Sequence, residues 1–171
     1  DKYANRLPAV QRFIREHGIN EIFAGDGGRY GIITQGGTHG MVARALRQLG
    51  AADGYGNSDV PMLVLNVIHP LLPEEIAEFM SDKDSVLVVE EGNPNLIETQ
   101  IAQIAHNGRI DCRVRGKDVL PMAGEYVTDV VRAGLADYLT SDGPGQLSAA
   151  AEANEAAITR ARDTARTCLS D

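Results

Sequence analysis

Two short runs made almost wholly of apolar residues, 62–68 and 85–89, most constrain the fold of this chain. Neither run alternates between apolar and polar side chains, so both faces of the strand it forms must meet nonpolar neighbours. Strands of that kind occur in parallel sheets that carry helices on both faces. The two runs therefore predict a parallel α/β architecture.

Helix signals follow each of these runs. Pro73 with Glu74 and Glu75 is typical of a first helical turn, because proline fits there and acids favour the positive end of the helix dipole. Asn93 and Pro94 predict a helix N-cap followed by proline at the first helical position.

The rest of the chain continues this alternation of strands and helices. Apolar pieces predict strands at 22–24, at 31–34 and at 110–114, where Cys112 is interpreted as a core residue, and a helix is predicted over 124–139. Such alternation implies right-handed βαβ units. We expect a three-layer α/β/α sandwich around a mostly parallel five-stranded sheet.

The composition changes after residues 141–145, Ser-Asp-Gly-Pro-Gly. From there the chain is rich in alanine and poor in large apolar residues, so its helicity would come from intrinsic propensity more than from packing. We predict one α/β domain over residues 1–142 and a helical arm or interdomain linker over residues 143–171.

The overall charge and apolar content exclude several classes of protein. There are 16 basic and 24 acidic residues, which give a net charge of −8, so nucleic acid is not an expected partner. No apolar run approaches the roughly 20 residues needed to cross a bilayer. The first residues lack the apolar core of a secretory signal, and the two cysteines show no metal-site spacing. We expect a cytoplasmic protein.

The glycine-rich segment Gly25-Asp26-Gly27 invites a metal interpretation, because thiamine-diphosphate sites hold Mg²⁺ with a Gly-Asp-Gly motif. That motif needs an asparagine pair about two dozen residues downstream, as a hard cation is held by several oxygen ligands. Only Asn57 stands at that distance. The segment is interpreted as a loop, and no metal ligand is assigned.

Several polar residues lie where predicted strands end, and ligands gather at that edge of open α/β sheets. The segment 36–38 opens a helix, so its backbone N–H groups could hold a phosphate, although a tight turn explains its glycines equally well. The resulting hypothesis is a small-anion or nucleotide site that uses Gly36, Gly37, Thr38, His69 and Glu91.

Two other interpretations of this edge stay open. Glu90, Glu91 and His69 could form an acid–base group, or the two glutamates could face a neighbouring domain or the N-terminus of the next helix. The second is favoured, because no nucleophile accompanies them. Cysteine clusters for iron–sulfur centres and complete nucleotide-binding signatures are absent from the sequence, and no catalytic residue is assigned.

The segments 65–76 and 85–91 resemble the transketolase C-terminal-like domain, in which a strand ends in Pro-Leu and a later strand ends in Val-Val-Glu-Glu. Within that group, residues 90–98, 116–121 and 6–8 are most similar to indolepyruvate ferredoxin oxidoreductases. The resemblance extends over about residues 6–139.

The resemblance implies a parent enzyme that oxidatively decarboxylates an arylpyruvate, passes electrons through iron–sulfur clusters to ferredoxin and forms an acyl-CoA. Thiamine diphosphate and Mg²⁺ would be held by other domains of that enzyme, because none of the corresponding motifs has a match here. The resemblance thus implies a non-catalytic domain, with no cofactor of its own, that packs against the others.

Overall fold

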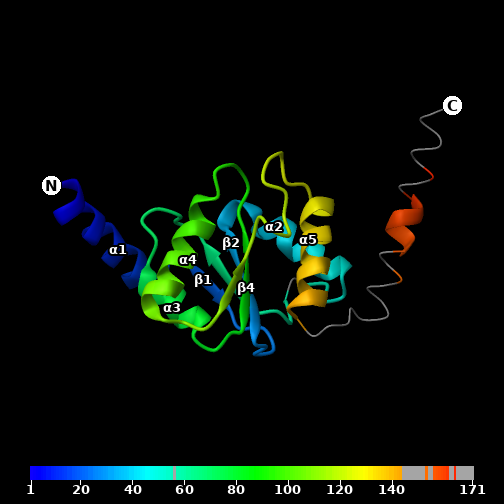
Figure 1. The fold of residues 1–171 in the computed structure, drawn as a ribbon, viewed down its shortest axis with the longest axis horizontal. Coiled ribbons are helices and arrows are strands. Elements are labelled where there is room, and N and C mark those ends of the chain that lie inside the picture. The colour runs from blue at the N-terminus through cyan, green and yellow to red at the C-terminus, as the bar shows by residue number, and fades with distance from the viewer. Residues whose placement is uncertain (56, 144–152, 154–155, 162–163, 165–171) are drawn as a thin grey trace.

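The computed structural model describes residues 1–55, 57–143, 153, 156–161 and 164. One sheet lies between two layers of helices (Figure 1). This arrangement confirms the predicted α/β/α fold class.

The sheet has five strands in the order β1-β3-β2-β4-β5. Only β1 runs antiparallel to its neighbour, and β2, β3, β4 and β5 are parallel, as the sequence predicted for most of the sheet. The strands are β1 (Glu21–Phe23), β2 (Tyr30–Gln35), β3 (Met62–Leu65), β4 (Ser85–Val89) and β5 (Arg113–Arg115).

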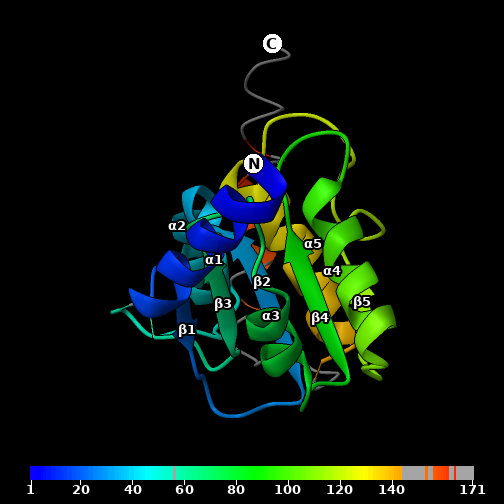
Figure 2. The ribbon, with the colours of Figure 1, turned by 90° about the vertical axis from the view of Figure 1, so that its left-hand side faces the viewer.

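The helices divide between the two faces of the sheet. The α2 and α5 helices cover one face, and α3 and α4 cover the other, with α1 alongside α3 (Figure 2). A short π-helical turn, Lys2–Arg6, precedes α1. The helices are α1 (Leu7–Glu16), α2 (Gly36–Gln48), α3 (Pro73–Met80), α4 (Leu96–Gly108) and α5 (Thr128–Ser141).

Successive side chains of the central strands lie in two separate hydrophobic cores. Ile32 is fully buried against α2 and α5, whereas the adjacent Ile33 is fully buried against α3 and α4. Met62 and Leu63 on β3 divide in the same way. Because both faces of a strand are buried, its sequence contains no polar alternation.

Three predicted boundaries are wrong, each for a local reason. The strand predicted over 62–68 ends at Leu65. The side chain of the next residue, Asn66, donates hydrogen bonds to Ile19 and Glu21 in the β1 region. The last helix begins at Thr128 and not near 124, which leaves Val127 half-exposed. The helix predicted at Asn93-Pro94 begins at Leu96, because a distant carboxylate caps it, as described below.

One predicted core position, Cys112, also differs from the structure. Cys112 lies just before β5 and is only half-buried, although it packs against the α3–α4 core. On α1 only Ile14 is buried, whereas Val10 and Phe13 are 40% and 53% exposed. A helical apolar stripe therefore does not by itself say how much of it this domain covers.

Most of the predicted arm, 143–171, lies outside the described residues. Residues 156–161 are helical, and the domain boundary at 142 stays a prediction. Within the described part of the chain, no helix is both long enough and apolar enough to span a membrane.

Candidate functional site

The parallel strands β3, β2 and β4 end side by side at one edge of the sheet, called the rim below, which is the upper edge in Figure 2. A hollow of about 720 Å³ opens there. It is lined by residues from the three strand ends and from the start of α2: Gln35, Gly36, Gly37, Thr38, Leu65, Asn66, Ile68, Glu91 and Gly92.

The rim hollow brings together four of the five residues predicted for an anion site. They are Gly36, Gly37, Thr38 and Glu91. His69 is not among them, and it lines a different groove, between α3 and α4. His69 and Glu91, two members of the hypothetical acid–base group, therefore line different hollows.

Close packing explains the first of the two glycines that begin α2 but not the second. A side chain at Gly36 would put its Cβ 2.5 Å from Oδ1 of Asn66, so a larger residue would force Asn66 or the helix start to shift. The Asn66 amide is fixed in turn, donating to the Ile19 carbonyl and to the Glu21 carboxylate, both at 2.8 Å. A Cβ on Gly37 would meet no atom within 4 Å.

Polar side chains around α2 are engaged within the protein. The buried Thr38 hydroxyl is 3.0 Å from the Gln35 carbonyl and 2.6 Å from the Thr34 hydroxyl. The Gln35 side-chain oxygen accepts the Glu91 N–H at 3.2 Å, which links β2 to the end of β4. The Thr38 hydroxyl therefore links the start of α2 to the end of β2.

Glu90 is a buried carboxylate, 5% exposed, directly after β4. Its two oxygens accept the N–H of Ile97 and one of them accepts the N–H of Glu98, all at 3.0 Å. These donors belong to the first turn of α4, where backbone N–H groups have no partner within the helix. Glu90 thus faces the N-terminus of the next helix, which is one of the roles that the sequence suggested for the two glutamates.

Lys117 is a rim residue that sequence reasoning missed. Its ammonium donates to the Glu90 carbonyl at 2.5 Å, to the Tyr126 hydroxyl at 2.8 Å and to the Pro121 carbonyl at 3.3 Å. Burial lowers the pKa of Lys117, and the charges of Glu90, Glu98 and Glu91 oppose that shift. The contact with Glu90 spans 27 residues, and no spacing rule in the sequence connects partners so far apart.

Tyr126 completes this attachment of the β5–α5 connection. Its hydroxyl donates to the Pro121 carbonyl at 2.6 Å, and its ring lies 4.7 Å from the Lys117 ammonium. Burial raises the pKa of Tyr126 to about 12, so the phenol stays protonated at neutral pH. The connection is thereby held against the end of β4.

The Gly25-Asp26-Gly27 segment lies at the opposite edge of the sheet, where β2 begins. Gly25 has a φ of +58°, and a Cβ on it would come within 2.6 Å of the Asp59 carbonyl, so close packing explains this glycine. Among the described residues, no group of three or more His, Cys, Asp or Glu side chains could hold a metal ion.

Comparison with known proteins identifies relatives of this domain. "Indolepyruvate oxidoreductase subunit IorA" of Methanothermobacter thermautotrophicus is 32% identical over 134 residues, which are 77% of this chain and 20% of that protein. The subunit of the same name from Methanothermobacter marburgensis is 38% identical over 104 residues, 60% of this chain and 16% of that protein. The chain spans about one fifth of the length of these relatives.

A solved structure titled "Split gene transketolase, inactive beta4 tetramer" aligns with a TM-score of 0.47 at 18% identity, over 67% of this chain and 40% of that one. Residues 20–144 match the family described as the indolepyruvate oxidoreductase domain. This match covers most of the chain and includes every strand of the sheet. The chain therefore belongs to the indolepyruvate oxidoreductase domain family.

Proposed function

We propose that this chain is a non-catalytic structural domain of a thiamine-diphosphate-dependent arylpyruvate:ferredoxin oxidoreductase. The observation that carries the proposal is that polar side chains at the rim are bonded to other groups of the same domain. Glu90, Thr38 and Lys117 use their polar atoms to hold the domain together. Groups committed in this way are not available to activate a substrate.

The parent enzyme would oxidatively decarboxylate indolepyruvate or a related 2-oxoacid to an acyl-CoA. Thiamine diphosphate, Mg²⁺ and iron–sulfur clusters would be held by its other domains, with ferredoxin and coenzyme A as partners of the whole enzyme and the cytoplasm as its location. Support comes from the family and from the relatives, which are about five times as long as their match to this chain.

Turnover assays on the 171-residue chain and on the parent enzyme test the proposal. With indolepyruvate, coenzyme A and oxidised ferredoxin, the parent should reduce ferredoxin and the chain alone should not. Calorimetry should detect no heat of thiamine diphosphate binding to the chain alone. Turnover by the isolated chain, or its absence from the parent reconstituted with its cofactors, would refute the proposal.

A second candidate function is a small-anion or nucleotide site at the rim hollow. It is favoured by the start of α2, where no side chain caps the first turn and Gly37 faces open space. Helix N-termini of this kind attract anions, although the Glu91 carboxylate in the same hollow opposes them.

Thermal-shift measurements with phosphate, nucleotides and coenzyme A test this second candidate. A ligand that binds should raise the melting temperature, and Gly37→Asp should abolish the rise by placing a carboxylate in the site. Gly40→Asp is the matched control, because Gly40 also faces open space one turn further along α2. Unchanged melting temperatures with all the ligands would exclude the site.

A further inference from the structure

A second concave surface lies away from the rim, between α3 and α4. This helix groove has a volume of about 560 Å³, and its apolar lining residues, called its floor below, are Pro70, Leu71, Pro73, Ala77 and Ile104. Its other lining residues are polar or glycine: Gln11, His69, Glu74, Gln100, Gln103, Asn107 and Gly108.

The α4 wall of the groove carries no ionisable acid or strong base. Residues 99–108 contain no Lys, Arg, Asp or Glu, in a chain of which 23% is charged. A helix face that meets water normally carries charges, whereas the centres of protein interfaces are depleted of them. The α4 wall has the composition of a covered surface.

The α3 wall adds one charge, and that charge is already paired. Glu74 accepts a hydrogen bond from the Arg15 guanidinium at 2.8 Å, so α1 supplies its counter-ion. Gln11 of α1 donates to the Leu71 carbonyl at 2.8 Å and closes the same side. The groove therefore offers an incoming surface apolar contacts and neutral amides, with no uncompensated charge among the residues that line it.

The lining residues follow the axes of the two helices. On α4 they are 100, 103, 104, 107 and 108, and the first four are the i, i+3, i+4 and i+7 positions of one helical stripe. This stripe is about 10 Å long at 1.5 Å per residue. A trough between two helices with walls of this periodicity accepts the ridge of a third helix.

We propose that the helix groove docks an amphipathic helix from another domain or subunit of the parent enzyme. The docking stripe of that helix would be apolar and amide-bearing, without charges, because a charge buried on this floor would find no partner. The inference rests on the proposed function, since it takes its occupant from the larger enzyme. It also gives His69, which the rim does not use, a place at an interface.

Thiol labelling at two neighbouring positions of α4 tests the proposal. Gln103→Cys places a thiol in the groove, and Ala102→Cys places a matched thiol at an exposed position that does not line it. Both variants carry Cys168→Ser, and the labelled peptides are resolved by mass spectrometry. In the 171-residue chain the two new thiols should react at similar rates.

In the assembled parent enzyme, the Gln103→Cys thiol should react at least about tenfold more slowly than in the chain alone, because interface centres exclude solvent. The Ala102→Cys thiol should change by less than about twofold, as expected for a position outside the interface. Equal slowing of both thiols, or of neither, in an active parent enzyme would overturn the docking proposal and leave the proposed function standing.

A charge variant separates docking from general crowding. In a parent enzyme carrying Asn107→Cys as the probe, Gln103→Glu should restore rapid labelling, because a buried carboxylate without a partner opens the interface. Ala102→Glu should leave the Asn107→Cys thiol protected. Protection that survives Gln103→Glu would contradict an uncharged docking stripe. Protection at 103 in a parent without oxidoreductase activity would instead refute only the proposed function.

Discussion

Glu90 shows how a buried acidic residue can act as a helix cap. Its carboxylate lies six positions before α4 in the sequence and accepts the N–H groups that begin this helix. A negative charge at a helix N-terminus is stabilised by the helix dipole. The acid pair at 90–91 is thus divided between one residue that caps a helix and one that faces the rim hollow.

Removing the cap should destabilise the domain. We expect Glu90→Ala to lower the free energy of unfolding by about 2 kcal/mol, because it leaves buried helix N–H groups without an acceptor. Urea denaturation followed by circular dichroism measures this loss. The control, Glu91→Ala, should cost less than about 0.5 kcal/mol, as is usual for surface changes. Equal losses for the two variants would show that Glu90 is not a cap.

The half-buried thiol of Cys112 should be slow to react. Burial raises the pKa of Cys112 to about 11, above the value of roughly 8.5 for a free cysteine. Because a raised pKa keeps the thiol protonated, its thiolate fraction at pH 8 is small and should grow with each pH unit up to about 11. Labelling rates between pH 7 and 10 provide the measurement, with a model peptide thiol as control. A rate that levels off near pH 9 would contradict the shift.

At the scale of single elements, α2 combines one glycine that packing requires with one that it does not. Gly36→Ala should lower the stability by about 1–3 kcal/mol, since its Cβ would press on Asn66 and an overpacked site must shift. Gly37→Ala should be neutral or stabilise by up to about 1 kcal/mol, because alanine favours helix and the space is open. Paired thermal melts of the two variants would show the difference, and similar melting temperatures would contradict it.

The elements also show what could be predicted from the sequence. The β3 and β4 strands and the start of α3 at Pro73 were predictable, because buried strands and proline-led helix starts leave local signals. The start of α4 was not, because Asn93-Pro94 carries a local cap signal while the real cap, Glu90, comes from the preceding strand end. The placement of Lys117 against Glu90 likewise depends on tertiary contacts.

The candidate site could also be predicted only in part. Strand order brings residues 36–38 and Glu91 to one edge, and that edge follows from parallel topology. His69 differs because its position depends on how the chain turns after Asn66, whose bonds to Ile19 and Glu21 join segments more than 40 residues apart.

At the scale of the whole molecule, the sheet separates two cores, and no side chain of the described residues belongs to both. Ile32→Val and Ile33→Val should each cost about 1 kcal/mol, one on each face. Their effects should add in the double variant, because the two side chains touch different sets of residues. Denaturant unfolding of the three variants, each analysed as a single cooperative transition, measures these losses of stability. A double variant whose loss departs from the sum by more than about 0.5 kcal/mol would show coupling through the sheet.

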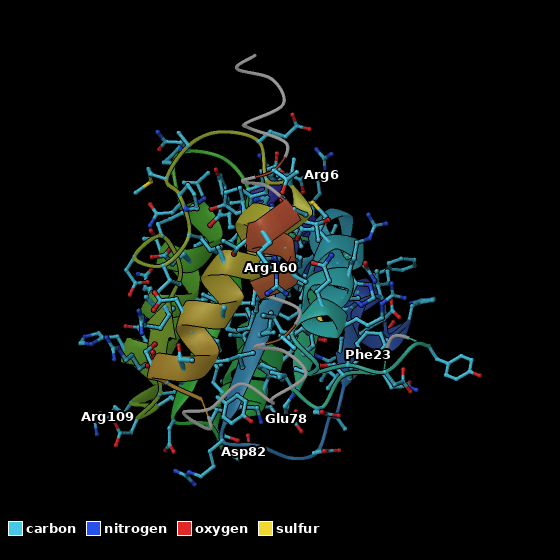
Figure 3. All side chains as sticks on the ribbon, turned by 90° about the vertical axis from the view of Figure 1, so that its right-hand side faces the viewer. Arg6, Phe23, Glu78, Asp82, Arg109 and Arg160 are labelled. Atoms are coloured by element: carbon cyan, nitrogen blue, oxygen red, sulfur yellow. The ribbon has the colours of Figure 1, made fainter. Side chains whose placement is uncertain are left out.

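The two ends of the sheet can be located in Figure 3 from the labelled residues near them. Arg6 lies toward the rim end in Figure 3, whereas Glu78, Asp82 and Arg109 lie toward the other end. At that other end the buried Tyr138 hydroxyl of α5 lies 3.0 Å from the carbonyls of both Gly31 and Ser85, where β2 and β4 begin.

One phenol therefore ties a helix to two adjacent strands at the edge away from the rim. The starts of β2 and β4 thus share one anchor, supplied by a helix that covers only one face of the sheet.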